Sequence, residues 1–505
     1  MQNTVLVGKY TLESLTTGMY ADPKIIYREY IQNCVDSLET AVKQNVIEEQ
    51  SMRIDIVLNA DESFIKIRDN GVGIPSSTAV STLLNIGHSE KRHTNNRGFR
   101  GIGRLGGMSY CDRLVFTTSA ENESCKTIVS FDCKKLRELL IPGANESLKL
   151  NDVLELVTTS KISEEMSDRH YFIVEMFGVS SFSDLLNLSV VTSYISQVAP
   201  VPYKTKRFYY CNELKEFLYK NGYAIEEFPI FIGEDDAHLE PVYKPNRVHY
   251  YCDKNKIKND EILNIRYFDV RIGDELFALG WYGECSWTGT ISMSEITGMR
   301  IRKGNILIGD GRTLNPIFRE GRFNGWTQGE LFIVTDKLIP NARRDDFEQT
   351  EIYSSFIQTL QEGIGYEISK KIRDASIARN DTSQKMLIDA QKQVVEAGAV
   401  LEDGFNSSTE KEKLLSDLSQ VQEALKRTKV KPELQEKKRQ IQEKIAERIE
   451  EVSDSKNFKF NQIKSGVDKK SKKLLAIVSE VLSQKLAKNL VDDIINAIIM
   501  KINGK

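Results

Sequence analysis

The first 103 residues carry three spaced elements whose order most constrains what this 505-residue chain can fold into. The first element places Glu29, Asn33 and Asp36 at steps of four and three residues. The second is the DNGVG run at 69–73, and the third is the GFRGIG run at 98–103. Each alone has an ordinary explanation, such as a solvated helix face, a turn or a flexible loop, so the constraint comes from the ordered set.

The first element is predicted to lie on one face of a helix. Side chains three and four residues apart are neighbours on a helix surface, so all three share a stripe. Asp22 followed by Pro23 is a helix start signal. Two carboxylates and a carboxamide on one face are costly to bury unless they are solvated or functional. For this triplet taken alone, a solvated face remains the alternative.

The second element ends a predicted strand. Residues 63–68 alternate as a strand does and run into Asp69, Gly71 and Gly73. The two glycines let the backbone turn sharply and approach a ligand closely, whereas an ordinary turn needs only one. The aspartate is able to accept a hydrogen bond from an amino group such as that of adenine. A plain strand-ending turn remains the alternative.

The third element follows a polar stretch without periodicity at 86–97, which predicts a loop. Gly98, Gly101 and Gly103 come next, before a strand is predicted at 114–118. Glycine-rich backbone ahead of a helix N-terminus suits phosphate, because amide N–H groups and the helix dipole point at the anion. The glycines do not follow a strand directly, so this is not a Rossmann fingerprint, and the chain has no G-x-x-x-x-G-K-[ST] loop.

Together the three elements resemble the N, G1 and G2 boxes of the GHKL (Bergerat-fold) ATPases. That superfamily includes gyrase, the ninety-kilodalton heat-shock chaperones, histidine kinases and mismatch-repair ATPases, with the MORC proteins as relatives. Residues 19–33 are similar to the chaperone helix, including Arg28 before Glu29. Residues 98–101 resemble the mismatch-repair version, whereas 101–103 are closer to the chaperones. The resemblance implies an α/β sandwich that binds ATP and magnesium.

The resemblance also implies roles for single residues. Glu29 would be the general base that orients or deprotonates the attacking water. Asn33 would complete magnesium coordination through its side-chain oxygen, and Asp69 would read the adenine amino group while Gly73 lets the base lie close. Lys91 would contact phosphate, with a solvated loop lysine as the alternative. The full expected binding set is Asn33, Asp36, Asp69, Gly71, Gly73, Lys91, Gly98, Gly101, Ile102 and Gly103.

One departure from the family pattern concerns a late strand. The family usually has a further threonine there, often after glycine, but residues 169–176 read RHYFIVEM. Thr117 and Thr118 lie on an earlier strand and are poor substitutes. Adenine recognition is therefore expected to rely more on Asp69 and a bound water.

A second α/β domain is predicted after the first. Between about 205 and 370 the composition shifts towards aromatic residues and short apolar runs. Strands are predicted at 267–272, 276–282 and 305–308. This region resembles the S5-like transducer domain of the chaperones and MORC proteins.

Residues 329–347 resemble the part of that second domain in which a strand leads into a loop carrying asparagine and a catalytic cation. By this match Arg344 would swing in to reach the γ-phosphate when the two domains close, with Arg343 as the nearby alternative. A cation there neutralises charge developing on the transferred phosphoryl group. The plain alternative is that both arginines pair with Asp345 and Asp346 on the surface.

The rest of the chain is predicted to be mostly helical. One helix from 352 to about 379 closes the second domain, and a coiled-coil hairpin follows. Ser407 and Glu410 are placed as a capping box for its first helix. The apolar positions of the two helices are Leu414, Leu418, Val421 and Leu425, then Leu434, Ile441, Ile445 and Val452.

The terminal segment carries an apolar face that is broad for a single helix and needs a partner. A homodimer contact is the simplest one. The face consists of Leu474, Val478, Leu482, Leu486, Leu490, Ile494 and Ile498. Charged residues interrupt the segment and exclude a membrane span there: Lys485, Lys488, Asp492 and Asp493.

Composition sets the remaining limits. With 40% hydrophobic residues the chain is able to form two or three domains, and a net charge of −3 gives no global attraction to nucleic acid. Basic runs at 469–473 and 204–207 are more often solvated faces than DNA contacts. Seven cysteines without a CxxC pair, and no signal peptide, indicate reduced thiols and a cytoplasmic location. The five histidines show no metal-binding spacing.

We therefore expect an α+β chain with an ATP-binding domain at 1–200, a transducer domain at 201–378 and a helical tail at 379–505. Neither a sensor histidine kinase nor a type II topoisomerase is expected, because the ATPase region comes first and no nicking tyrosine with an acidic metal-binding domain is recognisable. The first hypothesis is that the chain is a chaperone-like or MORC-like dimeric clamp, operated by ATP, that acts on a protein or DNA client. Bacterial proteins resembling this layout often belong to defence operons, so anti-phage defence is a family-level expectation. The second hypothesis is a non-hydrolysing, ATP-sensing scaffold that recruits partners through its coiled coil.

Overall fold

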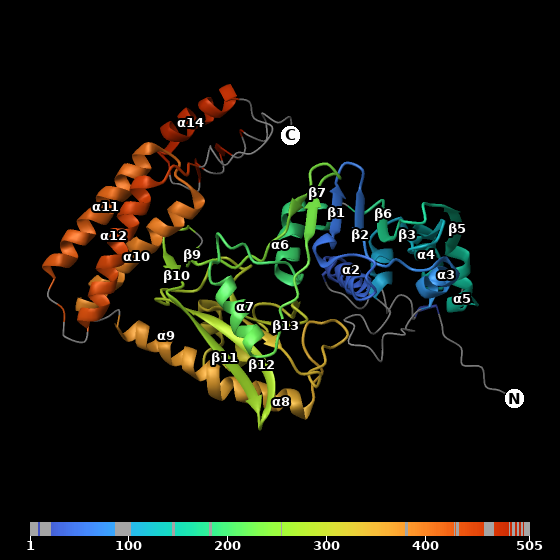
Figure 1. The fold of residues 1–505 in the computed structure, drawn as a ribbon, viewed down its shortest axis with the longest axis horizontal. Helices are drawn as coiled ribbons and strands as arrows, with labels where there is room; N and C mark the ends of the chain where they lie inside the picture. The colour runs from blue at the N-terminus through green and yellow to red at the C-terminus, as the bar shows by residue number, and fades with distance from the viewer. Residues whose placement is uncertain are drawn as a thin grey trace.

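The computed structural model confirms the α+β class. It describes residues 9–10, 22–85, 103–143, 147–180, 184–253, 255–378, 382–428, 430, 434–458, 469–483, 485–486, 490–491, 494–495 and 498. An N-terminal α/β region, a middle α/β region and a C-terminal helical region follow one another across the molecule (Figure 1).

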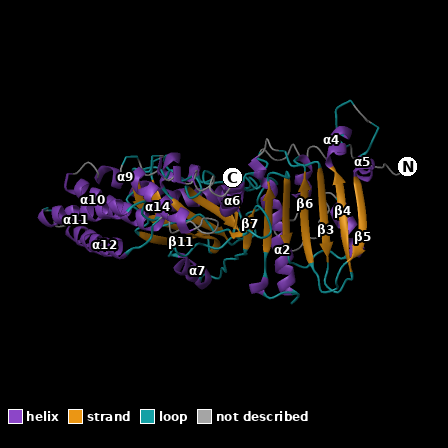
Figure 2. Cartoon of the chain, turned by 90° about the horizontal axis from the view of Figure 1, so that it is seen from above, coloured by secondary structure: helices purple, strands orange, loops and turns teal. Residues whose placement is uncertain are grey.

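The described part of the N-terminal region is built on an eight-stranded sheet with the order β5-β4-β3-β6-β2-β1-β7-β8. Figure 2 shows its strands lying side by side. Neighbouring strands run antiparallel except β1 and β7, which are parallel. The strands are β1 (Ile54–Asn59), β2 (Phe64–Asp69), β3 (Arg113–Ser119), β4 (Cys125–Asp132), β5 (Thr158–Glu164), β6 (Tyr171–Phe177), β7 (Ile230–Gly233) and β8 (Glu240–Pro241).

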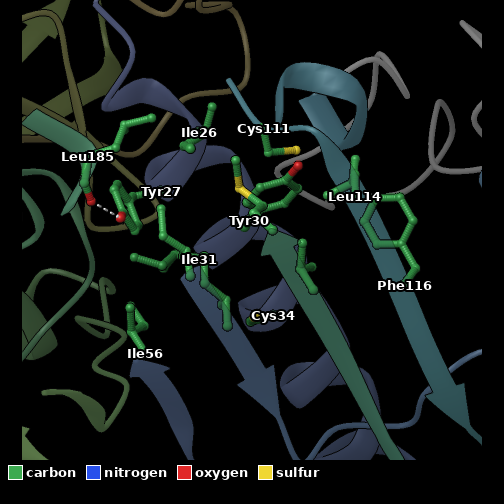
Figure 3. Packing of buried hydrophobic residues seen from close by; sticks show 14 of the residues in the cluster. Ile26, Tyr27, Tyr30, Ile31, Cys34, Ile56, Cys111, Leu114, Phe116 and Leu185 are labelled. Atoms are coloured by element: carbon green, nitrogen blue, oxygen red, sulfur yellow. Dashed lines mark hydrogen bonds between the residues drawn. The ribbon is translucent and has the colours of Figure 1, made fainter. Parts of the chain in front are cut away.

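Helices pack on this sheet around α2 (Ile25–Lys43), which begins after the predicted Asp22–Pro23 start signal. Its apolar side, including Tyr27 and Tyr30, is buried in the core shown in Figure 3. The Tyr27 hydroxyl donates to the Leu185 carbonyl at 2.6 Å. The other helices are η1 (Glu49–Ser51), α3 (Ser76–Leu84), η3 (Gly103–Ser109), α4 (Cys133–Leu139), α5 (Leu150–Val157), η4 (Asp184–Leu186) and α6 (Leu188–Val198).

The described chain passes between the first and second cores three times. It leaves the first core after Val201, and residues 203–218, with α7 (Cys211–Lys220), pack into the second core. Residues 228–242 then return to the first core, where they supply β7 and β8. From Val248 onward the chain packs in the second core. The boundary at residue 200 stays a prediction, and the first sheet takes two strands from beyond it.

The middle region contains a five-stranded sheet with the order β11-β12-β15-β13-β14 in its described part. The three strands predicted there are confirmed. In this sheet β13 and β15 run parallel, and the other pairs are antiparallel. The strands are β11 (Asn264–Ile272), β12 (Glu275–Glu284), β13 (Gly298–Lys303), β14 (Ile306–Ile308) and β15 (Gln328–Ile333), beside the small hairpin of β9 (His249–Tyr251) and β10 (Asn259–Glu261) and the short helices η5 (Asn315–Ile317) and η6 (Gly321–Trp326).

A buried ion cluster joins the middle sheet to α6. Glu330 of β15 pairs with Lys244 at 3.1 Å and with Arg302, and all three side chains are buried. Arg302 also donates to the carbonyl of Gln197 in α6 at 3.0 Å. Burial alone would raise the pKa of Glu330, but the charges of Arg302 and Lys244 lower it to about 2. The cluster therefore holds an ionised carboxylate at the contact between the two regions.

The predicted helix that closes the middle region is confirmed, with one interruption. It consists of α8 (Glu351–Leu360), a π-helical turn η7 (Gln361–Gly365) and α9 (Tyr366–Ala378). Gly365 allows this turn to press against the carbonyl of Ile317, because an added Cβ would collide with that oxygen.

The helical region contains α10 (Thr382–Asp403), α11 (Ser408–Arg427), α12 (Gln435–Asp454) and α14 (Lys469–Ser483). Lys411, near the start of α11, donates to carbonyls of Ser453 and Ser455 at the end of α12, so these two helices run antiparallel. The predicted hairpin is present, and α10 packs against it as a third helix. Ser407 caps α11 by accepting from the Glu410 N–H at 3.1 Å, while the Glu410 carboxylate accepts from the Asn406 N–H at 2.6 Å.

A buried histidine ties the helical region to the middle region. His249 of β9 lies 3.1 Å from Glu261 of β10 and 2.7 Å from Glu402 of α10. Arg448 of α12 approaches the same imidazole at 3.3 Å. Burial disfavours the charged imidazole, but the hydrogen bonds that it donates to the two glutamates outweigh this cost and raise the pKa of His249.

The last described helix presents apolar side chains outward. Leu474, Ile477 and Val481 of α14 are 61%, 58% and 50% exposed, whereas Leu475 is buried and the Ser479 hydroxyl donates to the Asn406 carbonyl. The predicted apolar face is exposed or half-buried at each of its positions. None of the helices in the described ranges combines the length and hydropathy that crossing a bilayer requires.

Candidate functional site

The predicted base and the predicted catalytic cation meet in the structure. The loop after β15 carries Arg344 to α2, where its Nε lies 4.0 Å from Oε1 of Glu29 and both side chains are 13% exposed. With its amide oxygen facing the guanidinium, Gln32 accepts from Arg344 Nη1 at 2.6 Å and Nη2 at 3.3 Å. The sequence predicts that Arg344 swings in when the domains close, but here the loop already lies against the helix.

Arg28 holds the same loop from the helix side. Its Nη2 donates to the Arg343 carbonyl at 2.8 Å, and its Nη1 lies 3.5 Å from the Arg344 carbonyl. The same Nη2 lies 3.3 Å from Glu29 Oε1. Two guanidinium groups therefore flank one carboxylate in a half-buried corner, and the excess positive charge suits an incoming phosphate.

The geometry separates the two neighbouring arginines. Arg343 is 62% exposed and pairs with Asp345 at 3.1 Å, which is the surface pairing considered as the plain alternative. Arg344 instead turns to α2, and its φ of +55° lies in the left-handed region that side chains larger than glycine rarely adopt. Hydrogen bonds from the Arg344 N–H to the Asn341 carbonyl and from the Gly309 N–H to the Arg344 carbonyl hold it there. Such strained residues cluster at functional sites.

Asp69 is buried at the end of β2 with one oxygen available. Its Oδ1 accepts from the Ser37 hydroxyl at 3.0 Å and from the Gly71 N–H at 2.8 Å. Its Oδ2 has no hydrogen-bond partner of good geometry among the described residues, and the buried Cys34 thiol is a weak donor beside the carboxyl. Burial raises the pKa of Asp69 to about 6, although the hydrogen bonds from Gly71 and Ser37 oppose this. A buried carboxylate oxygen of this kind needs a hydrogen-bond donor, and the amino group of a base is a suitable one.

The two glycines of the turn are required by protein contacts. Gly73 has a φ of +64°, and an added Cβ would collide with the carbonyl oxygen of Ser119 on β3. A Cβ at Gly71 would collide with the Ser37 hydroxyl on α2. The turn is thus pressed between helix and sheet, and the expected approach of a base to Gly73 stays a prediction.

Two residues at this turn were not expected from the sequence. The Thr118 hydroxyl accepts from the Ile74 N–H at 2.8 Å and donates to the Tyr171 carbonyl at 3.1 Å. Nδ1 of His170 lies 2.8 Å from the Gly71 carbonyl. From the sequence, Thr118 is a poor candidate because its strand comes earlier in the chain. The sheet order β3-β6-β2 brings all of these groups together, and only that order would have revealed them.

The structure describes some of the other predicted nucleotide-binding residues and leaves others outside its described ranges. Asn33 lies half-buried on α2 one turn after Glu29, and Asp36 is buried. Gly103 begins η3, which is anchored to α2 by a hydrogen bond from the Gly107 N–H to the Tyr30 hydroxyl at 3.1 Å. Outside the described residues lie Lys91, Gly98, Gly101 and Ile102.

The donor set suits a magnesium–nucleotide complex. No cluster of three or more acidic, histidine or cysteine side chains suited to a metal ion occurs in the described ranges. A single amide oxygen from Asn33 is what magnesium needs when phosphate oxygens and water supply its other ligands. The available Oδ2 of Asp69 and the two arginines beside Glu29 fit the base and the phosphates of one nucleotide.

The site combines a helix that carries Glu29, a strand that ends in the buried carboxyl of Asp69, and the opposing Arg344 on an α/β framework. Residues 25–160 match the family model described as "Histidine kinase-, DNA gyrase B-, and HSP90-like ATPase". This part of the chain is therefore a GHKL-type ATPase domain, which confirms the resemblance at the level of the superfamily and supports ATP binding and hydrolysis at that level. The chaperone-like or MORC-like branch stays a prediction. The chain matches no curated protein.

Proposed function

We propose that this chain hydrolyses ATP with residues from both α/β regions. The observation that carries the proposal is the contact of Arg344 with Glu29 and Gln32, which brings the two predicted catalytic groups to one corner. Asp69 accepts from the adenine amino group with its available oxygen. The β- and γ-phosphates lie toward Glu29, where the positive charge is concentrated.

In this arrangement Glu29 accepts the proton of the attacking water, a role open to a carboxylate near the γ-phosphate. Arg344 stabilises the negative charge that develops on the transferred phosphoryl group. Arg28 binds the backbone carbonyls of Arg343 and Arg344 and so keeps the arginine loop in place. Asn33 offers its side-chain oxygen to magnesium, and the bound ion supplies further charge neutralisation on the phosphates.

The test is a steady-state ATPase assay of the wild type, Glu29→Gln, Arg344→Ala and the matched control Arg343→Ala. We expect Glu29→Gln to lose about 100-fold or more in kcat while still binding ATP. Arg344→Ala should lose on the order of 100- to 1,000-fold, whereas Arg343→Ala should stay close to wild type because its side chain lies on the surface. Unchanged hydrolysis in Glu29→Gln would contradict the assignment of the base. Equal losses in the two arginine variants would contradict the choice of Arg344.

We further propose that the chain works as a homodimeric clamp, chaperone-like or MORC-like, on a protein or DNA client. Support comes from α14, whose exposed Leu474, Ile477 and Val481 form an apolar stripe suited to a second copy. The helical region that carries this stripe extends away from the ATPase region (Figure 1). A place in bacterial anti-phage defence remains part of this proposal.

The clamp is tested by sedimentation and light scattering. Leu474→Glu combined with Ile477→Glu should give a monomer, whereas Ile257→Glu, at another exposed apolar position, should leave the dimer intact. A wild type that stays monomeric at all concentrations would refute the dimer. A non-hydrolysable ATP analogue should make the dimer more compact. ATPase activity stimulated by DNA would favour the MORC-like client, and an inactive chain that still binds ATP would favour the sensing scaffold.

A further inference from the structure

The turn after Asp69 is held at both ends by side chains, one from β3 and one from the residue that precedes β6. Thr118 holds the Ile74 N–H at its far end, and His170 contacts the Gly71 carbonyl at its near end. Gly71 in turn donates its N–H to Oδ1 of Asp69. The same short peptide segment therefore links His170 to the carboxyl group that is proposed to read the base.

The chemistry of this contact fixes the proton on His170. A carbonyl oxygen only accepts hydrogen bonds, so the imidazole Nδ1, 2.8 Å away, is the donor. Aspartate or alanine at this position would be unable to donate. Asparagine would place an amide N–H at a comparable distance from its backbone, so it preserves the donor without the ring.

The end of the β2–β6 ladder brings His170 close to the turn that carries Asp69. Asp69 and Phe172 form the last pair of the antiparallel β2–β6 ladder on the side of the turn. His170 lies two residues before Phe172, and its side chain reaches the carbonyl of Gly71, two residues beyond Asp69.

We propose that His170 is a positioning residue for base recognition: it fixes the Gly71 peptide, and that peptide aims the available oxygen of Asp69 at the amino group of adenine. This inference rests on the proposed function. It gives a role to a residue of the segment 169–176, where the threonine of the family pattern is missing. Loss of this positioning should reduce the preference for a 6-amino purine over a 6-oxo purine in binding. The 6-amino group donates to Asp69, whereas a 6-oxo group only accepts.

The test measures binding of ATP and inosine triphosphate to wild type, His170→Ala, His170→Asn and the control His238→Ala, whose histidine is exposed. Calorimetry with the Glu29→Gln background avoids hydrolysis. We expect His170→Ala to weaken ATP binding by about three- to tenfold, the range for one lost hydrogen bond. Binding of inosine triphosphate should change little, so the preference for ATP shrinks. His170→Asn should restore the preference, and His238→Ala should match wild type.

The outcomes separate this inference from the proposed function. Equal weakening of both nucleotides in His170→Ala, with no rescue by asparagine, indicates a general loss of structure and overturns the positioning role. An unchanged preference in His170→Ala overturns it as well, while ATP binding by the wild type leaves the proposed ATPase standing. A wild type that binds neither nucleotide overturns both. Melting curves of each variant show whether its fold is retained.

Discussion

The buried carboxyl of Asp69 lowers the stability of the N-terminal region at neutral pH, and an amide in its place should recover that stability. Burial raises the pKa of Asp69 from 3.8 to about 6. A difference of about two pKa units corresponds to roughly 3 kcal/mol once the group is ionised in both states. The cost is large compared with the few kcal/mol by which most domains are stable.

The sign follows from which state releases its proton first. Below about pH 4 the carboxyl is protonated in both the folded and the unfolded chain, so the ionisation cost is absent. Between about pH 4 and pH 6 the unfolded chain ionises first, and the free energy of unfolding falls by about 1.4 kcal/mol per pH unit. Above about pH 6 both states are ionised and the cost stays constant.

Asp69→Asn removes this titration while keeping the main contacts. Its amide oxygen is able to accept from Ser37 and Gly71 as Oδ1 does in the wild type. We expect similar stability of the two proteins near pH 4 and a gain of about 3 kcal/mol for the variant at pH 7. This gain slows exchange through domain opening on the order of a hundredfold.

Hydrogen exchange of peptides from β1 and β2, followed by mass spectrometry without nucleotide, measures this gain. Comparing variant and wild type at each pH cancels the intrinsic pH dependence of exchange. Asp61→Asn, at an exposed position between the same two strands, is the control and should follow wild type throughout. A difference that stays constant from pH 4 to pH 7, or a variant that is less stable at pH 7, would refute the reasoning. The stabilised Asp69→Asn variant should also bind ATP more weakly, because its amide donates where the base needs an acceptor.

Three further changes test other parts of the structure. Gly73→Ala should destabilise the chain by about 1–3 kcal/mol in urea unfolding, because of its positive φ and the collision with Ser119, whereas Gly143→Ala, with positive φ in open space, should cost less. Glu330→Gln should cost about 3–5 kcal/mol in thermal unfolding, because it leaves a buried lysine and arginine without their anion. The pKa of His249 is raised in the folded chain, so its ionised form contributes to the free energy of unfolding. This contribution is fully present below the unfolded pKa of about 6.5 and is lost as the pH rises through the folded pKa. Protease sensitivity of the contact between α10 and β9 should therefore increase at high pH, and His249→Gln should remove that pH dependence.

Local patterns in the sequence predict the frame of the candidate site well. The start of α2 and the strand before Asp69 follow from turn chemistry and alternation, whereas the strand before the arginine loop was predicted from the family resemblance. Gln32 was missed although it lies three residues after Glu29, a spacing that places both on one side of the helix. That signal was present, but only the folded chain shows that the side of α2 bearing Gln32 receives Arg344.

Other features depend on which distant segments become neighbours. The roles of Thr118 and His170 arise from the order of strands, which residue patterns within each strand do not specify. β7 is only four residues long and pairs in parallel with a strand from far earlier in the chain, so it gives a weak local signal. The separation of Arg343 from Arg344 likewise needed the backbone conformation at the second of these residues.

The chain passes three times between its first two cores, and this limits both how the protein can be truncated and how the two regions can rotate. A protein truncated at residue 200 would lose β7 and leave β1 as an open sheet edge, a template for association with other chains. It would also leave apolar residues of the first core without the segment at 228–242 that covers them. Any rotation between the two regions must bend three covalent connections together. The two regions are therefore not joined by a single hinge.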